Sequence, residues 1–262
     1  YFVIGNPVEH SFSPKLHNYW IKKNNIDAFY DKKLVQESEL ESIISEIRNK
    51  KIEGINVTVP FKKSVIPFLD ELSPEAKASQ SVNTICYHTG KLLGHNTDIS
   101  GFELGIKFSK YDVSNKVVFI LGAGGVVPSI VVALKKMGAA KIIISNRTKE
   151  KAEKLRDFFD YIEVIEWGKF KKANMIINAT SLGLDKNDKI KINFRDFGTS
   201  SFFYDVIYNP SETDFLKKAK ALGNKTENGK MMFIYQAHQA FTIWHKQMPE
   251  IDEESISLLE ND

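Results

Sequence analysis

Two residues of opposite charge, Lys62 and Asp98, lie where an acid/base pair could form. Lys62 follows residues 55–59, which alternate like a β-strand, and ligands bind beyond strand ends in open α/β sheets. Asp98 ends the run Gly-His-Asn-Thr-Asp at the start of a helical pattern. A lysine and a carboxylate in a closing cleft can move the proton of a hydroxyl group that loses a hydride. We expect the Lys62 side chain to be exposed in that cleft and to hold little structure together.

Each of these residues also has a simpler explanation. Lysine is abundant, with 32 lysines left when the four arginines are subtracted from the 36 basic residues, and Lys63 is adjacent to Lys62. Lys62 could therefore be an ordinary surface lysine. Asp98 could be the N-cap of the helix or an acid of its first turn, where a carboxylate is favoured by the helix dipole.

Two serines near the start of the chain, Ser11 and Ser13, could bind a carboxylate. They lie two residues apart in a segment that we expect to be extended, so both hydroxyls can point the same way. Ser13 is followed by Pro14, and a serine cap with proline in the first turn is typical of a helix start. The alternative is that Ser13 is only the N-cap of a helix.

A glycine-rich turn is formed by Gly122, Ala123, Gly124 and Gly125. It follows the apolar segment 117–121 and precedes a helical pattern that begins at Val126. In this context glycines let the backbone approach a pyrophosphate, and the helix N-terminus offers free N–H groups. The turn therefore predicts a dinucleotide site, with a plain tight turn as the alternative.

The residues beyond the next strand favour NADP over NAD. An NAD site usually places an acid there for the ribose hydroxyl, but this chain has Asn146, Arg147 and Thr148. The Arg147 guanidinium can form a bidentate hydrogen bond with a 2′-phosphate, and the Thr148 hydroxyl can donate to the same phosphate. The alternative is that Thr148 only caps the next helix and that Arg147 is solvated.

These residues must be positioned by alternating strands and helices. The patterns predict strands at 1–4, 28–33, 55–59, 81–87, 91–94, 117–121, 141–145, 162–165, 175–178 and 202–206. They predict helices at 13–25, 38–50, 98–109, 126–137, 148–159, 212–222, 230–245 and 253–260. Such alternation indicates an α/β fold with a doubly wound parallel sheet, and 262 residues suffice for two domains.

Composition narrows the function classes. The net charge of +3 is scattered, so we expect no nucleic-acid patch. The histidines lack a His-x-x-x-His spacing, so we expect no metal site.

The single Cys86 fits a reducing compartment, and the strand-like opening gives no sign of a signal peptide, so we expect a cytoplasmic protein. Residues 117–134 carry no charge, but their glycines and proline indicate a strand, a turn and a buried helix rather than a membrane span.

Taken in order, these motifs resemble the shikimate dehydrogenase family over nearly the whole chain. The matching segments are 5–18 (Gly-Asn-Pro-Val-Glu-His-Ser-Phe-Ser-Pro-Lys-Leu-His-Asn), 54–62 (Gly-Ile-Asn-Val-Thr-Val-Pro-Phe-Lys), 81–84 (Ser-Val-Asn-Thr), 94–98, 122–125, 146–148, 177–181 (Ile-Asn-Ala-Thr-Ser), 205–210 (Asp-Val-Ile-Tyr-Asn-Pro) and Gly229 through Gln236-Ala237 to Trp244. The chain departs from the family pattern at Val126-Val127-Pro128, where small and basic residues are common, and this bulk narrows the approach of a cofactor.

The resemblance implies NADP-dependent interconversion of shikimate and 3-dehydroshikimate in aromatic amino acid biosynthesis. It implies a substrate domain of residues 1–98 joined by the final helices at 230–262, and a Rossmann-type NADP domain at 99–229. Lys62 would transfer the proton with Asp98 as its partner. The implied substrate contacts are Ser11, Ser13 and Tyr208 at the carboxylate, and Thr58, Lys62, Asn83, Asp98 and Gln236 around the ring hydroxyls. The implied cofactor contacts are Gly122, Ala123, Gly124, Gly125, Val126, Asn146, Arg147, Thr148, Val206 and Gly229.

Two alternatives remain beside this interpretation. One is a quinate/shikimate dehydrogenase of the same superfamily that accepts NAD, which an aspartate just after Arg147 would favour. Thr148 stands there instead. The other is a non-catalytic NADP-binding regulator on this fold, which the loss of Lys62 or Asp98 would favour. We expect no membrane partner and either a monomer or a homodimer.

Overall fold

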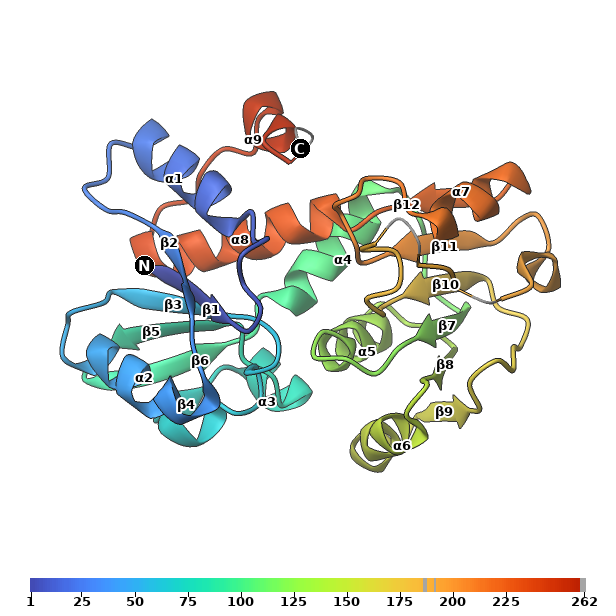
Figure 1. Ribbon diagram of the computed structural model, residues 1–262, viewed down its shortest axis with the longest axis horizontal. Coiled ribbons are helices and arrows are strands. Elements are labelled where there is room, and N and C mark those ends of the chain that lie inside the picture. The colour runs from blue at the N-terminus through green and yellow to red at the C-terminus, as the bar shows by residue number, and fades with distance from the viewer. Residues whose placement is uncertain (186–187, 191, 260–262) are drawn as a thin grey trace. The chain divides into compact units, whose positions relative to one another are not determined.

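The computed structural model describes residues 1–185, 188–190 and 192–259. It divides into two compact units (Figure 1), unit 1 with residues 1–101 and 234–262 and unit 2 with residues 102–233. The divisions fall inside two helices, α4 (Asp98–Phe108) and α8 (Lys230–His245). The sequence-based boundaries, after residues 98 and 229, lie three and four residues earlier along the chain.

Unit 1 contains a six-stranded mixed sheet in the order β2-β1-β3-β5-β6-β4. Its strands are β1 (Phe2–Gly5), β2 (Asp31–Leu34), β3 (Gly54–Val57), β4 (Glu71–Leu72), β5 (Thr84–His88) and β6 (Lys91–His95). Strands β1, β2 and β3 are parallel, whereas β5 runs antiparallel to both β3 and β6. The other elements are α1 (Ser13–Lys23), η1 (Glu37–Glu39), α2 (Leu40–Arg48), η2 (Ile66–Phe68), α3 (Pro74–Ser79) and α9 (Glu253–Ser257).

The two faces of this sheet carry different chemistry. Ile55 and Val57 of β3 point into a buried apolar cluster with Ile44 and Ile47 of α2. Because strand residues alternate in direction, Asn56 lies on the opposite face. Strands β5 and β6 are antiparallel, and the first residue of β5, Thr84, pairs with the last residue of β6, His95. The polar residues just before β5 and just after β6 therefore lie next to each other.

Unit 2 contains an all-parallel six-stranded sheet in the order β12-β11-β10-β7-β8-β9. Its strands are β7 (Val117–Leu121), β8 (Lys141–Ser145), β9 (Ile162–Ile165), β10 (Met175–Asn178), β11 (Phe202–Asp205) and β12 (Lys225–Glu227), and its other elements are α5 (Val127–Lys136), α6 (Lys149–Phe158), η3 (Phe194–Phe197) and α7 (Asp214–Ala221). The strand order reverses between β7 and β10. This is the doubly wound arrangement that the sequence predicts, and a ligand site is expected at such a reversal.

The structure corrects several sequence predictions. The N-cap of α1 is Phe12 rather than Ser13, and no side chain caps this helix end. The patterns missed α3, β4 and β12, which are too short to show a clear period. Helix α9 ends at Ser257, and the predicted end at residue 260 lies outside the described residues. Among the described helices, none is long and apolar enough to cross a membrane.

Candidate active site

Lys62 and Asp98 form an ion pair inside unit 1. Lys62 lies in the turn after β3 and Asp98 is the first residue of α4, and Lys62 Nζ is 2.6 Å from Asp98 Oδ2. Only 11% of the lysine side chain and 7% of the aspartate side chain are exposed. The expectation that Lys62 is exposed is therefore wrong. Lys62 and Asp98 are 36 positions apart in the chain. Their side chains meet because β3 and β6 run in the same direction, so that the turn after β3 and the start of α4 after β6 lie at the same end of the sheet.

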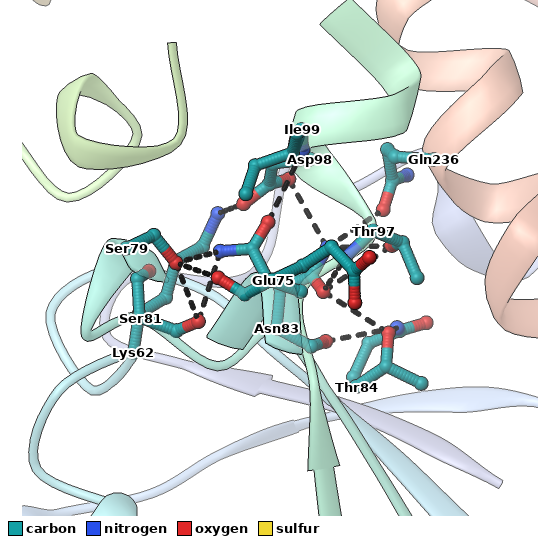
Figure 2. Close-up of polar contacts among 12 residues, drawn as sticks. Lys62, Glu75, Ser79, Ser81, Asn83, Thr84, Thr97, Asp98, Ile99 and Gln236 are labelled. Carbon is teal, nitrogen blue, oxygen red and sulfur yellow. Dashed lines mark hydrogen bonds and ion pairs between the residues drawn. The ribbon is translucent and has the colours of Figure 1, made fainter. Parts of the chain in front are cut away.

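Asn83 holds the other oxygen of this carboxylate. Its Nδ2 donates to Asp98 Oδ1 at 3.1 Å and to Gln236 Oε1 at 3.4 Å, while its Oδ1 accepts from the Thr97 N–H at 2.8 Å. Figure 2 shows Lys62, Asn83 and Gln236 around Asp98, with Gln236 supplied by α8. Four residues predicted from the sequence are thus brought together. Because both oxygens of Asp98 have partners, the carboxylate is fixed in direction.

The sequence analysis missed the residues that hold the start of α4. Asn96 Oδ1 accepts from the Ile99 N–H at 3.1 Å, and Asn96 Nδ2 donates to Ser79 Oγ at 3.0 Å and to the Ser81 carbonyl at 2.9 Å. The bond to the Ile99 N–H could have been expected from the sequence, since an asparagine just ahead of a helical pattern often accepts from a backbone N–H of the first turn. The contacts with Ser79 and Ser81 could not have been, because they depend on how α3 packs.

Ser11, Ser13 and Thr58 lie in the same unit as the ion pair. The Ser13 N–H donates to Ser11 Oγ at 3.3 Å, and Phe12 between them has helical φ and ψ angles. The two serines therefore lie in a local turn at the start of α1, and the expected extended segment is wrong. Ser13 is buried even though it does not cap the helix. Thr58 directly follows β3, and its N–H donates to the Ile4 carbonyl at 2.9 Å.

The glycine turn in unit 2 lies where the strand order reverses. Gly122 has a φ of +111°, and a Cβ added there would lie 2.6 Å from the Ala179 carbonyl oxygen, so only glycine fits. A Cβ on Gly125 would meet nothing within 4 Å, and one on Gly124 only Ala179 O at 3.9 Å. Packing within the protein therefore requires glycine at position 122, but not at positions 124 and 125. The open space over Gly124 and Gly125 suits a ligand that approaches the backbone closely.

The start of α5 offers unpaired donors beside this space. The N–H groups of Gly124, Gly125 and Val126 donate to no group within residues 1–185, 188–190 and 192–259. Free N–H groups at a helix N-terminus attract phosphate. Pro128 lies in the first turn, where its missing N–H removes one such donor. The residues present therefore fit a pyrophosphate.

The segment after β8 is open to solvent. Asn146 Nδ2 donates to the Thr148 carbonyl at 2.7 Å and so shapes the loop. Thr148 occupies the N-cap position of α6, but its hydroxyl makes no capping bond. Arg147 is exposed, and its guanidinium has no hydrogen bond or ion pair with the rest of the described chain. Both side chains are therefore available to a phosphate.

Val206 and Gly229 touch within unit 2. A Cβ on Gly229 would lie 2.1 Å from the Val206 carbonyl oxygen, so glycine is required at this contact. Asp205 precedes Val206 and accepts from the Thr213 hydroxyl at 2.6 Å and from the Ile207 N–H at 3.0 Å. Burial raises the pKa of Asp205 to about 6, although these hydrogen bonds oppose the shift. This cluster fixes the loop that carries Val206.

Tyr208, predicted to help hold the substrate carboxylate, belongs to unit 2 rather than unit 1. Its ring packs on Phe233, with the centroids 4.5 Å apart. Within the described part of the chain, no three His, Cys, Asp or Glu side chains gather as metal ligands.

Comparison with known proteins identifies the family. The family model described as shikimate dehydrogenase substrate binding domain matches residues 3–85, and the one described as shikimate / quinate 5-dehydrogenase matches residues 105–185. The shikimate dehydrogenase (NADP(+)) of Pelagibacter ubique (strain HTCC1062) is 58% identical over 99% of this chain and 98% of its own length. The chain belongs to the shikimate dehydrogenase family.

Solved structures of shikimate dehydrogenases agree with this assignment. The crystal structure of the Aquifex aeolicus enzyme is similar, with a TM-score of 0.88, 37% identity, and coverage of 99% of this chain and 95% of that one. The Thermus thermophilus enzyme, in complex with NADP(H) and shikimate, has a TM-score of 0.87 and 30% identity over 99% of this chain and 96% of that one. The family and its two-unit α/β fold, predicted from the sequence, are confirmed.

Proposed function

We infer that this chain is an NADP-dependent shikimate dehydrogenase, which reversibly reduces 3-dehydroshikimate to shikimate on the route to chorismate and the aromatic amino acids. The observation that carries this function is the buried Lys62–Asp98 pair, with 2.6 Å between its charged atoms. A non-catalytic regulator would have no need of a proton-transfer group held in this way. The named relative at 58% identity supports the same activity.

The ion pair supplies the proton chemistry. In reduction, the Lys62 ammonium donates a proton to the oxygen of the carbonyl that receives the hydride. In oxidation, the amine of Lys62 accepts the hydroxyl proton as the hydride leaves the adjacent carbon. The Asp98 carboxylate holds the nitrogen in place in both directions, and Asn83 holds the carboxylate. Proton transfer by a positioned group of this kind contributes about 10²- to 10⁴-fold to a rate.

The glycine turn and the loop after β8 would bind the cofactor. NADP(H), when bound, accepts or supplies the hydride. We assign its pyrophosphate to the open backbone at Gly122, Ala123, Gly124, Gly125 and Val126. The 2′-phosphate is assigned to Asn146, Arg147 and Thr148, and the nicotinamide to the backbone of Val206 and Gly229. The free N–H groups at the turn and the unpaired guanidinium of Arg147 support this assignment.

The remaining polar residues would bind the substrate. We assign the carboxylate to Ser11 and Ser13. The ring hydroxyls are assigned to Thr58, Asn83 and Gln236, beside the ion pair. Support comes from the contacts that already join Asn83 to Asp98 and Gln236 in unit 1. We also propose a cytoplasmic location, which fits the single buried Cys86. A monomer or homodimer without nucleic-acid or membrane partners stays a prediction.

An absorbance assay at the NADPH band tests the function. The purified protein is offered shikimate and quinate separately, each with NADP and with NAD. We expect turnover with shikimate and NADP, and at least tenfold lower kcat/KM in the other three combinations. Comparable rates with quinate and NAD would indicate the broader quinate/shikimate enzyme. No turnover in any combination would favour the non-catalytic regulator.

A further inference from the structure

Tyr30 is a buried residue, 1% exposed, that directly precedes β2 and is not among the residues assigned above to the substrate or the cofactor. Its hydroxyl donates to Asn56 Oδ1 at 2.6 Å and also hydrogen-bonds to the Ser13 side chain. Asn18 of α1 holds its backbone, accepting from the Tyr30 N–H at 2.9 Å and donating to its carbonyl at 2.7 Å. The His17 ring stacks on the Tyr30 ring at 4.2 Å, with the planes 3° apart. The ring is therefore fixed, and its hydroxyl is held at one acceptor.

The amide of Asn56, in the middle of β3, can take only one orientation. Its Nδ2 donates to the Asn83 carbonyl at 3.0 Å and to Thr84 Oγ1 at 3.0 Å. A carbonyl can only accept, so the nitrogen must face Asn83. The oxygen of the amide then faces Tyr30 and needs a donor there, because Asn56 is buried.

The hydrogen bonds continue in the same direction towards the ion pair. Thr84 Oγ1 donates to Asn83 Oδ1 at 3.2 Å, and Asn83 Nδ2 donates to Asp98 Oδ1 at 3.1 Å. Figure 2 shows Thr84, Asn83 and Asp98 along this line. From Tyr30 to Asp98 each group accepts from the one before and donates to the one after. Hydrogen bonds aligned in this way strengthen one another in a buried site, and this series ends on a carboxylate.

We propose that Tyr30, Asn56 and Thr84 are positioning residues of the catalytic site. Together with Thr97, whose N–H donates to Asn83 Oδ1 at 2.8 Å and whose hydroxyl accepts from Asn83 Nδ2 at 2.8 Å, they fix the amide of Asn83. That amide in turn keeps the carboxylate of Asp98 directed at its lysine partner. This inference rests on the proposed function, because it concerns the geometry of that same proton-transfer pair. If the three residues served only to hold β3 against β5, their loss would lower stability without changing turnover.

Two substitutions interrupt the series while keeping side-chain shape. Tyr30→Phe removes the first donor, and Thr84→Val removes the hydroxyl between the two asparagines. Two controls match them. Thr84→Ser keeps the hydroxyl, and Tyr204→Phe removes the hydroxyl of a tyrosine in unit 2 that is fully buried and has no partner for this group in the described chain. For each variant we would measure kcat, the KM for shikimate and for NADP, and Tm.

The proposal predicts a fall in kcat of about 5- to 20-fold for Tyr30→Phe and Thr84→Val, since small misplacements of a catalytic group reduce rates strongly. The KM for NADP should not change, and both controls should stay within about twofold of the parent. A kcat within twofold of the parent in Tyr30→Phe or Thr84→Val, even with a lowered Tm, would overturn the proposal. If one variant fails to fold, the other decides. A parent protein without shikimate turnover would refute the proposed function instead.

Discussion

The two candidate sites of this protein are built in opposite ways. In unit 1 the functional side chains already bind one another, since Lys62, Asn83 and Asp98 are joined by hydrogen bonds and largely buried. In unit 2 the candidate cofactor site is made of open backbone and exposed side chains. Its N–H groups at Gly124 and Gly125 have no partner in the described chain, and Arg147 is exposed.

The difference follows from what each site must do. Proton transfer requires a fixed direction between donor and acceptor, and buried side chains that satisfy one another provide it. Phosphate binding requires unpaired donors and room for the anion, so its residues must stay open until the ligand arrives. We therefore expect substitutions in unit 1 to change stability and turnover together, and substitutions at the cofactor site to change affinity alone.

The largest effect is expected for Lys62→Ala. Its kcat should fall by about 10²- to 10⁴-fold, the range for an acid/base group. Its Tm should also fall, because breaking a buried ion pair leaves a buried charge and costs about 3–5 kcal/mol. Steady-state kinetics and thermal unfolding check both. Lys63→Ala, at the exposed neighbouring lysine, is the control and should change neither. Near-normal turnover in Lys62→Ala would refute the assignment.

Arg147→Ala should change cofactor affinity without changing stability. A hydrogen bond to a charged group is worth about 1.5–3 kcal/mol, so NADP affinity should fall by about 10- to 150-fold. NAD has no 2′-phosphate and should bind as before. Titration of both cofactors checks this, with Arg156→Ala, at another exposed arginine, as the control. Equal weakening of both cofactors would mean that Arg147 holds the loop rather than the phosphate.

Asp205 is a buried charged group in unit 2, so it tests whether effects on stability depend on burial rather than on the unit to which a residue belongs. Burial raises its pKa from 3.8 to about 6 in the folded state, despite its hydrogen bonds. A raised acid pKa gives stability that is fully present below about pH 4 and is lost as the pH rises through 6. The free energy of unfolding of the parent, relative to Asp205→Asn, should therefore fall by up to roughly 3 kcal/mol between pH 4 and 7. Denaturant unfolding at several pH values checks this, and a constant difference would contradict it.

The smallest effect is expected for Gly125→Ala. A Cβ there meets no protein atom within 4 Å, so Tm should stay within about a degree of the parent. NADP affinity should fall by about tenfold, because the added methyl occupies the space of the pyrophosphate. Gly90→Ala, at an open turn of unit 1, is the control for cofactor binding only, because the φ of +85° at Gly90 makes an alanine there strained. Unchanged NADP affinity would show that the turn is only structural.

Local patterns in the sequence determined much of this protein. Strands β7, β8, β9 and β10 have the predicted bounds, because each is a short, mainly apolar segment between clear turns. The strand–glycine–helix order identified the turn at Gly122, since a positive φ there excludes other residues. The motifs also identified the family, and so the residues Lys62 and Asp98.

Only the tertiary structure decided which polar residues are buried and which groups they hydrogen-bond. Ser13 looked like a helix cap, but the cap position belongs to Phe12. Lys62 was expected to be exposed, but the packing of α4 against the sheet edge buries it with its partner. His17 carries no signal in the sequence, yet it is stacked on Tyr30, and burial lowers its pKa to about 3. Burial and hydrogen-bond partners depend on segments far apart in the chain, so local pattern cannot specify them, whereas helix and strand periods depend on neighbours alone.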